Sequence, residues 1–325
     1  MTNILEENEN LDAAKSESPR LPNGYKLIDY EIVQFIAQGA FGAVYEVKHI
    51  NSLHFALKIE SRKSDVQNLK MEVLVLKELE KLKSPFFCRL YFCAKSDKFN
   101  IIIMSLTGKH LNEIRANCKD MKFSKHCGVR IAIDCLSAIQ LLHGVGYIHR
   151  DIKPANFCIS LTNPTQIILL DFGFCRKYLD SNGQLRHPRW YTMFKGTVRY
   201  GSIGAHHGHE CSRKDDLESW LYVVVEFIVG TLPWYTMTNP INVAFSKHGA
   251  RTKGMREFLS GCPKELLHIM MYIDSLKYYD APDYALIRGL LTSALAKCEK
   301  VGNLEYDWEA EPRPKIEEDT SEEDG

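Results

Sequence analysis

Long apolar runs and paired cysteines are both missing from this sequence. No uninterrupted hydrophobic stretch reaches the roughly 18 residues that a membrane-spanning helix needs, so we expect no membrane partner. The ten cysteines are scattered, and none of them forms a C-x-x-C pair. The first residues are polar and acidic, unlike a secretory signal. We therefore expect reduced thiols and a cytoplasmic or nuclear location.

Net charge is also absent, since 41 basic residues balance 41 acidic residues. The balance hides an uneven distribution: residues 305–325 carry −8, residues 1–24 carry −3, and residues 25–304 therefore carry +11. A basic body favours an acidic or phosphorylated protein partner, whereas the simpler alternative is that the acidic ends only keep an average domain soluble. No stacking-aromatic or zinc-finger pattern accompanies the basic residues, so we expect no nucleic acid partner.

The most informative stretch runs from Tyr147 to Asn156 and reads Y-I-H-R-D-I-K-P-A-N. It places a carboxylate (Asp151), a lysine (Lys153) and the carboxamide of Asn156 at fixed offsets, and Pro154 restricts the backbone between the last two. This set suits phosphoryl transfer. The carboxylate accepts the proton of an attacking hydroxyl, the lysine neutralises the moving phosphate, and the carboxamide oxygen holds a divalent metal ion.

The stretch resembles the catalytic loop of the eukaryotic protein kinases, H-R-D-x-K-x-x-N. A second motif supports the resemblance, because a short apolar strand at 167–170 ends in Asp171-Phe172-Gly173 and matches the D-F-G metal site of that family. The resemblance implies ATP and Mg²⁺ as cofactors. It implies that Asp151 is catalytic, that Lys153 stabilises the transferring phosphoryl group, and that Asn156 and Asp171 hold the metal ion.

Residues before this loop resemble the nucleotide-binding parts of the same family. The turn Gln38–Gly42 matches the glycine-rich loop, except that Ala37 stands where the first glycine is expected. Lys58 lies in a strand that matches V-A-I-K, and Glu72 of the following helix is placed to pair with it. The resemblance implies that the nucleotide site includes Ile36, Gly39, Gly42, Val44, Ala56, Lys58, Glu72, Met104, Ser105 and Thr107.

The segment after Gly173 narrows the family. It closes with G-T-V-R-Y at 196–200 in place of A-P-E, which is similar to the casein kinase 1 group. The stretches 213–219 and 230–234 match that group as well, although Gly204 stands where the group has asparagine. The T-V-R-Y sequence, the Glu-Val pair after Met71 and the V-E-F at 225–227 are typical of its tau-tubulin kinase-like branch.

This closer resemblance implies further roles. Thr197 is expected to hydrogen-bond Asp151 and Lys153. The enzyme is expected to need no phosphate on its activation segment, residues 174–203. Arg199 lies where the group binds an anion beside the substrate cleft, and Lys195 adds positive charge nearby in sequence. We therefore expect protein substrates with acidic or already phosphorylated residues.

The fold class implied is α+β, the two-lobed protein kinase fold. We expect a small lobe (25–107) of five antiparallel strands with one helix, and a larger, mainly helical lobe (108–300). Composition predicts disorder for the acidic segments 1–24 and 301–325. The sequence pattern predicts strands at 30–37, 43–49, 54–59, 89–94 and 100–106, and helices at 65–82, 109–117, 125–143 and 217–229. The resemblance implies that helices near 239–247, 263–277 and 283–297 complete the large lobe.

The sequence as a whole predicts a monomeric serine/threonine protein kinase. The alternative is a catalytically weak or inactive pseudokinase that acts as an interaction module. Only Ala37 and Gly204 favour that alternative, because every charged residue of the mechanism is present. A zinc site is a further alternative, although the spacing of its possible ligands fits no zinc pattern; these are His206, His207, His209 and Cys211.

Overall fold

The chain divides into two units in the computed structural model, which describes residues 20–39, 42–63, 67–299 and 306–310. The first unit comprises the chain up to Lys70 together with Tyr91–Met104. The second unit comprises Met71–Leu90 and the chain from Ser105 onward. Each unit is described below by itself.

This division differs from the predicted boundary at 107/108, because the segment 71–90 belongs to the second unit. Its backbone explains the difference. The Leu169 N–H donates a 2.9 Å hydrogen bond to the Phe86 carbonyl. The Phe87 ring also packs at 6.1 Å from that of Phe172.

The first unit is built on a sheet whose strands follow the order β1-β2-β3-β4-β6-β5. The strands are β1 Lys26–Leu27, β2 Tyr30–Gln38, β3 Gly42–His49, β4 His54–Ser61, β5 Leu90–Lys95 and β6 Phe99–Ser105. β2 pairs antiparallel with β1 and β3, and β3 pairs antiparallel with β4. The five predicted strands are present, and β1 is added because two residues are too few to show a period in the sequence.

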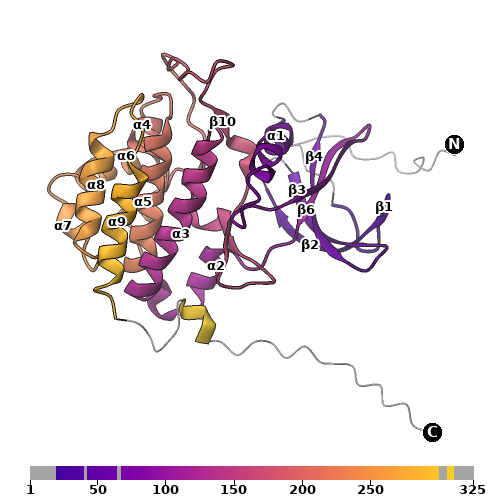
Figure 1. Cartoon of the computed structure of the whole chain (residues 1–325), viewed down its shortest axis with the longest axis horizontal. Coiled ribbons are helices and arrows are strands. Elements are labelled where there is room, and N and C mark those ends of the chain that lie inside the picture. The colour runs from indigo at the N-terminus through magenta and orange to yellow at the C-terminus, as the bar shows by residue number, and fades with distance from the viewer. Residues whose placement is uncertain (1–19, 40–41, 64–66, 300–305, 311–325) are drawn as a thin grey trace, which may run out of the picture. The chain divides into compact units, whose positions relative to one another are not determined.

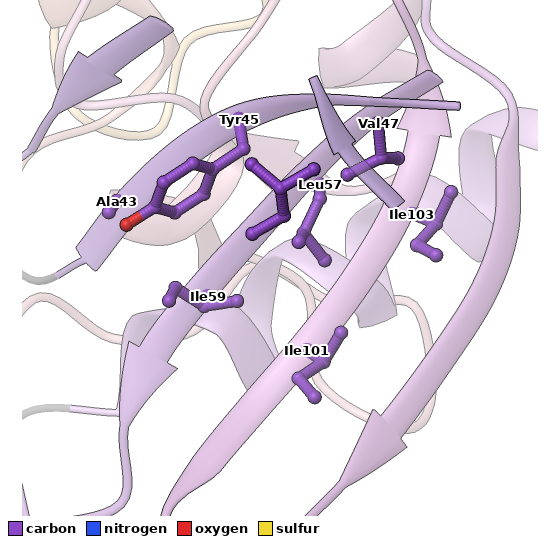
Figure 2. Packing of buried hydrophobic residues seen from close by; sticks show 8 residues of the cluster. Ala43, Tyr45, Val47, Leu57, Ile59, Ile101 and Ile103 are labelled. Carbon is purple, nitrogen blue, oxygen red and sulfur yellow. The ribbon is translucent and has the colours of Figure 1, made fainter. Parts of the chain in front are cut away.

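Apolar side chains alternate along these strands and form the core of the first unit. Every second residue of β3 is buried, as expected for a strand with one face against a core. β4 and β6 follow β3 in the same sheet and contribute further apolar side chains to this core. The set drawn in Figure 2 includes Ala43, Tyr45, Val47, Leu57, Ile59, Ile101 and Ile103.

The residues just before the sheet pack against it, which differs from the predicted disorder of 1–24. Leu21 contacts the core, and its N–H donates a 3.0 Å hydrogen bond to the Tyr45 hydroxyl. The Gly24 N–H donates to the Ile32 carbonyl over 2.7 Å. The prediction is therefore wrong for residues 20–24, because one apolar side chain and two backbone bonds fix them, and residues 1–19 lie outside the described residues.

The second unit is mainly helical. The α-helices are α1 Asn68–Glu80, which begins in the first unit, α2 Leu111–Ala116, α3 Lys125–Gly144, α4 Ile203–His206, α5 Arg213–Val229, α6 Pro240–Gly249, α7 Met255–Phe258, α8 Glu265–Ser275 and α9 Tyr284–Leu295. The 3₁₀ helices are η1 Lys119–Met121, η2 Pro154–Asn156, η3 Phe172–Phe174 and η4 Asp307–Ala310. Two short antiparallel pairs complete the unit: β7 Tyr147–Ile148 with β10 Arg176–Lys177, and β8 Phe157–Ile159 with β9 Ile167–Leu169. In the described part of the chain, no helix is both long enough and apolar enough to cross a membrane.

Helix α5 forms the centre of the second unit. It packs against α3 and α8, and both of these also contact α9 (Figure 1). Every residue from Leu217 to Ile228 is buried, which confirms the prediction of a helix that is covered on all sides. The helix starts before the predicted residue 217, at Arg213, because Ser212 and Asp215 form a capping box in which each side chain accepts the other's backbone N–H.

Tyr306–Ala310 also differs from the predicted disorder of the tail 301–325. Tyr306 is buried, and its ring stacks on Trp308 at 4.5 Å. Asp307 accepts hydrogen bonds from the backbone N–H and the hydroxyl of Ser124, the N-cap of α3, both at 2.6 Å. The acidic composition of the tail concealed two aromatic residues that anchor it, so the prediction is wrong here; the rest of 301–325 lies outside the described residues.

Candidate active site

Asp216, in the first turn of α5, fixes the backbone of the catalytic loop. Its carboxylate accepts hydrogen bonds from the N–H groups of His149 and Arg150, at 2.6 and 2.8 Å, and from His143 Nε2 at 2.8 Å. Burial alone raises the pKa of Asp216, but the hydrogen bond and charge of His143 outweigh burial, so the pKa is lowered. The ionised carboxylate therefore holds Arg150 in a left-handed conformation, with φ at 68°.

Asp151 is buried in this loop, and both of its carboxylate oxygens have polar partners. Lys153 Nζ donates to Oδ2 over 2.6 Å, and the Thr197 hydroxyl donates to Oδ1 over 2.8 Å. Asn156 Nδ2 donates to the Asp151 carbonyl over 2.8 Å. The structure thus brings together Asp151, Lys153, Asn156 and Thr197. The predicted bond between Thr197 and Lys153, both described residues, is not formed, because Lys153 is directed to the other carboxylate oxygen.

Gly196 allows the activation segment to approach the loop this closely. Its φ is 101°, and a Cβ atom at this position would lie 2.4 Å from the Arg150 carbonyl oxygen and 3.3 Å from Asp151 Oδ1. A side chain would be strained in this conformation and would collide with the loop backbone. Glycine at 196 is therefore what lets the neighbouring Thr197 reach Asp151.

The two predicted metal ligands, Asn156 and Asp171, lie on segments that a backbone hydrogen bond joins. Asp171 follows β9 and Leu170, whose N–H donates to the Asn156 carbonyl over 2.8 Å. Since Asn156 Nδ2 is used by the loop, the amide presents its oxygen as the remaining polar atom. One carboxylate and one amide oxygen are hard donors of the kind that Mg²⁺ takes, with water and phosphate completing its shell. The residue types at these two positions therefore fit Mg²⁺.

The zinc alternative has no support in the second unit. Among the residues that the structure describes, no three His, Cys, Asp or Glu side chains converge as a metal site. His206 Nε2 instead lies 3.0 Å from Lys247 Nζ. Burial raises the pKa of Cys211 well above its ordinary value, which opposes the thiolate form that zinc binds. His207 and His209 thus remain without the further ligands that a zinc ion needs.

In the first unit, the glycine turn joins β2 and β3. The Gly39 N–H donates to the Gly42 carbonyl over 2.8 Å, and residues 40–41 lie outside the described residues. A Cβ at Gly42 would lie 2.0 Å from the Ile59 carbonyl oxygen, so only glycine fits. Lys58 of β4 is the cross-strand partner of Val44, which in turn pairs with Ala37 on its other side.

The other nucleotide-site residues of the prediction lie on several elements. Ile36 is exposed on β2, Ala56 is buried on β4, and Glu72 is buried on α1 in the second unit. The pairing of Glu72 with Lys58 stays a prediction. Met104, on β6, is buried and ends the first unit.

The segment 105–108, where the chain re-enters the second unit, is extended and is held by a backbone hydrogen bond at each end. The Ser105 N–H donates to the Arg89 carbonyl over 3.0 Å, and the Gly108 N–H donates to the Ile159 carbonyl over 2.9 Å. Thr107 lies between these two anchors. The predicted hinge therefore has a fixed backbone, as recognition of an adenine edge by backbone groups requires.

Arg199 and Lys195, the predicted anion-binding pair, differ in their surroundings. Arg199 donates to the Tyr235 carbonyl over 3.1 Å and lies 3.9 Å from the centre of the Tyr235 ring. Burial, followed by the positive charges of Arg150, Arg189 and Arg176, lowers the pKa of Lys195. The region around Lys195 is thus strongly positive, whereas Arg199 is partly engaged by the protein itself.

Glu210 is a site residue that the sequence analysis missed. It is buried, and Arg189 binds it through two hydrogen bonds, of which that from Nη2 measures 3.1 Å. Arg176 Nε lies 3.3 Å from the same carboxylate. The only sequence signal was a single acid in a run of histidines. The Glu210 carboxylate therefore links two parts of the activation segment: β10, through Arg176, and the later stretch that contains Arg189.

The comparisons with known proteins agree with this geometry. Residues 30–274 match the family model of the protein kinase domain. A probable serine/threonine-protein kinase of Dictyostelium discoideum is 34% identical over 87% of this chain and 57% of the relative. Casein kinase I homolog 3 of Schizosaccharomyces pombe is 35% identical over 86% of the chain and 65% of the relative. A serine/threonine-protein kinase of Caenorhabditis elegans is 31% identical over 87% of the chain and 76% of the relative.

The chain spans less than two thirds of the first two of these relatives, so the match concerns the kinase domain that they share. The two-lobed fold class predicted from the sequence is confirmed by the family match and by the sheet and helical units. Two observations lead to one assignment. Asp151 contacts Lys153 and Thr197, and a relative is named casein kinase I homolog 3. The chain belongs to the protein kinase family, in its casein kinase I-like group of serine/threonine kinases.

Proposed function

We propose that this protein transfers the γ-phosphoryl group of ATP to serine and threonine hydroxyls of protein substrates. The observation that carries the proposal is the buried Asp151 carboxylate, held on one oxygen by Lys153 and on the other by Thr197. Oδ2 also accepts a longer bond of 3.5 Å from Asn156 Nδ2, whereas Oδ1 keeps a further lone pair and can still accept a hydrogen bond from an incoming hydroxyl. Held in this way, the carboxylate is oriented before the substrate arrives.

The chemistry assigns one role to each residue of the loop. Asp151 orients the substrate hydroxyl and accepts its proton as the oxygen–phosphorus bond forms and the bond to ADP breaks. Lys153, whose ammonium is partly exposed, stabilises the negative charge of the transferring group. Thr197 keeps the Asp151 carboxylate in its orientation. Asn156 and Asp171 hold Mg²⁺, which neutralises phosphate charge when it is bound.

The nucleotide contacts are proposed from the family resemblance. Backbone N–H groups near Gly39 and Gly42 approach the phosphates, and Lys58, paired with Glu72, holds the α- and β-phosphates. Adenine meets the backbone of Ser105 and Thr107 beside Met104. Glycine at 42 is required by the close approach of its backbone to the Ile59 carbonyl, so the phosphate role of this turn rests on the resemblance.

We also propose a preference for substrates with acidic or phosphorylated residues before the target. The net charge of +11 on residues 25–304 and the positive surroundings of Lys195 support it. Arg199 is the candidate for direct anion contact. The test compares acidic and neutral serine peptides with wild type and Arg199→Ala. An unchanged preference in Arg199→Ala would remove that residue from the anion site.

Within the casein kinase I-like group, we assign the chain to the tau-tubulin kinase-like branch. The assignment rests on the T-V-R-Y sequence at 197–200, the Glu-Val pair after Met71, and the V-E-F at 225–227. A phosphopeptide comparison of cells carrying wild type or Asp151→Asn tests it. Proteins that lose phosphate only in the variant would identify the substrates.

The activation segment is proposed to need no phosphate. In many kinases a phosphate neutralises arginines next to the catalytic loop. Here the Glu210 carboxylate already occupies the guanidinium groups of Arg189 and Arg176. Protein made in bacteria and treated with phosphatase should therefore keep its initial rate. Activity that appears only after another kinase has acted would contradict this.

Two structural details weigh against the pseudokinase alternative, which stays open until turnover is measured. Ala37 pairs with Val44 just after a register shift in β2, and it does not adopt the positive φ that only glycine tolerates well. Gly204 lies in α4, where a Cβ would approach Asp215 Oδ1 to 3.0 Å, so glycine suits this site. The deciding experiment is a titration with Mg-ATP and casein. Absence of both ATP binding and turnover would establish the interaction module instead.

A further inference from the structure

Lys247 is a fully buried lysine that the chemistry described above does not use. It lies on α6, and lysine is among the residues least often found without solvent contact. Its ammonium contacts the carbonyls of Val198 and Gly201, at 2.9 and 2.6 Å, and His206 Nε2 at 3.0 Å. An ammonium group has three donors, so these three acceptors account for all of them. Its direct partners are thus backbone and imidazole rather than a carboxylate.

Two aromatic rings complete the surroundings of the ammonium. Tyr222 of α5 and Trp234 lie 4.9 and 5.6 Å from Nζ, within the range of a cation–π interaction. The Tyr222 hydroxyl is fixed by Glu218 Oε1 at 2.6 Å. Trp234 Nε1 donates to the Arg199 carbonyl over 2.8 Å. Lys247 and Trp234 therefore bind carbonyls of the same short segment.

That segment directly follows Thr197, whose hydroxyl contacts Asp151. Residues 198–201 form irregular backbone, whose polar groups need partners where they are buried. The N–H groups of Tyr200 and Gly201 both donate to the Thr197 carbonyl at 2.9 Å, which closes the turn. The Val198 and Gly201 carbonyls are left to Lys247. The Thr197 side chain extends from the other end of this turn to Asp151.

We propose that Lys247 is a positioning residue for phosphoryl transfer. By binding Val198 and Gly201 from α6, its ammonium fixes the turn that sets the Thr197 hydroxyl on Asp151 and directs Arg199 toward the substrate side. Its kinetic consequences rest on the proposed kinase function. Its structural consequence, a rigid turn at 197–201, does not depend on that function and can be measured without substrate.

The test uses the full chain with Lys247→Met, which keeps the apolar stem and removes all three donors. Lys253→Met is the matched control, because Lys253 is an exposed lysine six positions further along. Trp234→Phe is the second variant, since it keeps an aromatic ring and removes the donor to Arg199 together with the second ring of the buried indole. Two measurements are made on each: hydrogen exchange of peptides covering 197–202, and kcat and KM for casein and for ATP, normalised to the folded fraction.

For Lys247→Met, we expect faster exchange at 197–202 with unchanged exchange in α3. We also expect kcat/KM for casein to fall on the order of ten- to a hundredfold. A loss of this size is typical when a catalytic group, here the Asp151 carboxylate, is displaced by up to about one ångström. KM for ATP should stay within about twofold, since uniform binding of the nucleotide is untouched. Trp234→Phe should change in the same direction, and Lys253→Met should match wild type.

Several results would overturn the proposal. If the normalised kinetics and the hydrogen exchange of Lys247→Met equal those of wild type, Lys247 has only a structural role in the core. A fall in folded fraction with unchanged kinetics per folded molecule would show the same. If Lys247→Met does not fold, Trp234→Phe decides, and wild-type behaviour in that variant counts against the proposal. A wild type without turnover would refute the kinase function, while the exchange comparison would still test the rigid turn.

Discussion

The Thr197 hydroxyl lies 2.8 Å from Asp151 Oδ1, and 46 residues of chain separate the two. This bond connects the activation segment directly to the carboxylate that we propose as the acceptor of the substrate proton. Removing the hydroxyl in Thr197→Val, with nearly unchanged volume, should lower kcat about ten- to a hundredfold, because the carboxylate loses its orientation. Steady-state kinetics with casein measure it. Thr197→Ser, which keeps the donor, should retain most activity, and a wild-type kcat in Thr197→Val would contradict the role.

Glu210 should support both the stability and the activity of the activation segment. Glu210→Gln keeps the shape of the side chain but leaves Arg189 and Arg176 without their charged partner. Because Arg189 is half exposed, the loss in free energy of unfolding should be moderate, about 1–3 kcal/mol, together with a lower initial rate. Urea unfolding and initial rates measure the two effects. The control is Glu257→Gln at an exposed position, and equal values for both variants would exclude this role.

Lys247 should make stability depend on pH. Burial, opposed by the charge of Glu218 and aided by that of Arg251, lowers its pKa from the ordinary 10.5 to about 7. His206 from α4 and Tyr222 from α5 also face the ammonium. Between pH 7 and 10.5 the folded state holds Lys247 mostly as the neutral amine, which still has two N–H donors for the Val198 and Gly201 carbonyls, whereas the unfolded state holds the ammonium. Stability therefore rises with pH in that window, is lost as pH falls back toward 7, and changes no further below it.

The comparison of wild type with Lys247→Met isolates this effect, because all other titrating groups are common to both. From pH 7.5 to 9, the free energy of unfolding of wild type should rise relative to the variant by about 1.4 kcal/mol per pH unit. Urea unfolding at several pH values gives the difference. A gap between the two proteins that stays constant over this range would show that Lys247 has no depressed pKa. Lys253→Met should follow wild type.

Asp307 should stabilise the start of α3. Its carboxylate binds the N–H and hydroxyl of Ser124, and the Ser124 oxygen in turn accepts the Cys127 N–H at 3.2 Å. Asp307→Ala removes the acceptor and should lower the free energy of unfolding by about 1–2 kcal/mol, as loss of a helix cap does. Glu299→Ala, at an exposed acid near the end of α9, is the control. Equal midpoints of urea unfolding for the two variants would contradict the capping role.

The parts of the site that could be predicted are those encoded by neighbouring residues. Asp151, Lys153 and Asn156 lie within six positions, and Pro154 restricts their backbone, so the local pattern was sufficient. Asp171 was predicted from the D-F-G match after an apolar strand, and its role as a metal ligand stays a prediction. These motifs depend little on tertiary context, and the same holds for the buried helix α5, whose apolar residues cover every side.

The parts that could not be predicted depend on contacts between distant segments. Lys247 is separated by 46 residues from Gly201, and a lysine in a helix is expected at the surface. Glu210 binds Arg189 across 21 residues, and nothing local distinguishes it from a solvated acid. Tyr306 was missed because the composition of a window averages two aromatic residues with many acidic ones. In each case the tertiary partner, not the local sequence, determines the burial of the side chain.

The central claim is that the Asp151 carboxylate orients the substrate hydroxyl and accepts its proton during phosphoryl transfer. The most direct measurement is the rate at which purified wild type and Asp151→Asn transfer labelled phosphate from Mg-ATP to casein, with both proteins shown to be folded. Asparagine keeps the size of the side chain but is a poor proton acceptor. We expect transfer by the variant to fall by about three orders of magnitude or more, which corresponds to about 4 kcal/mol of transition-state stabilisation. Transfer by Asp151→Asn at the wild-type rate would contradict the account.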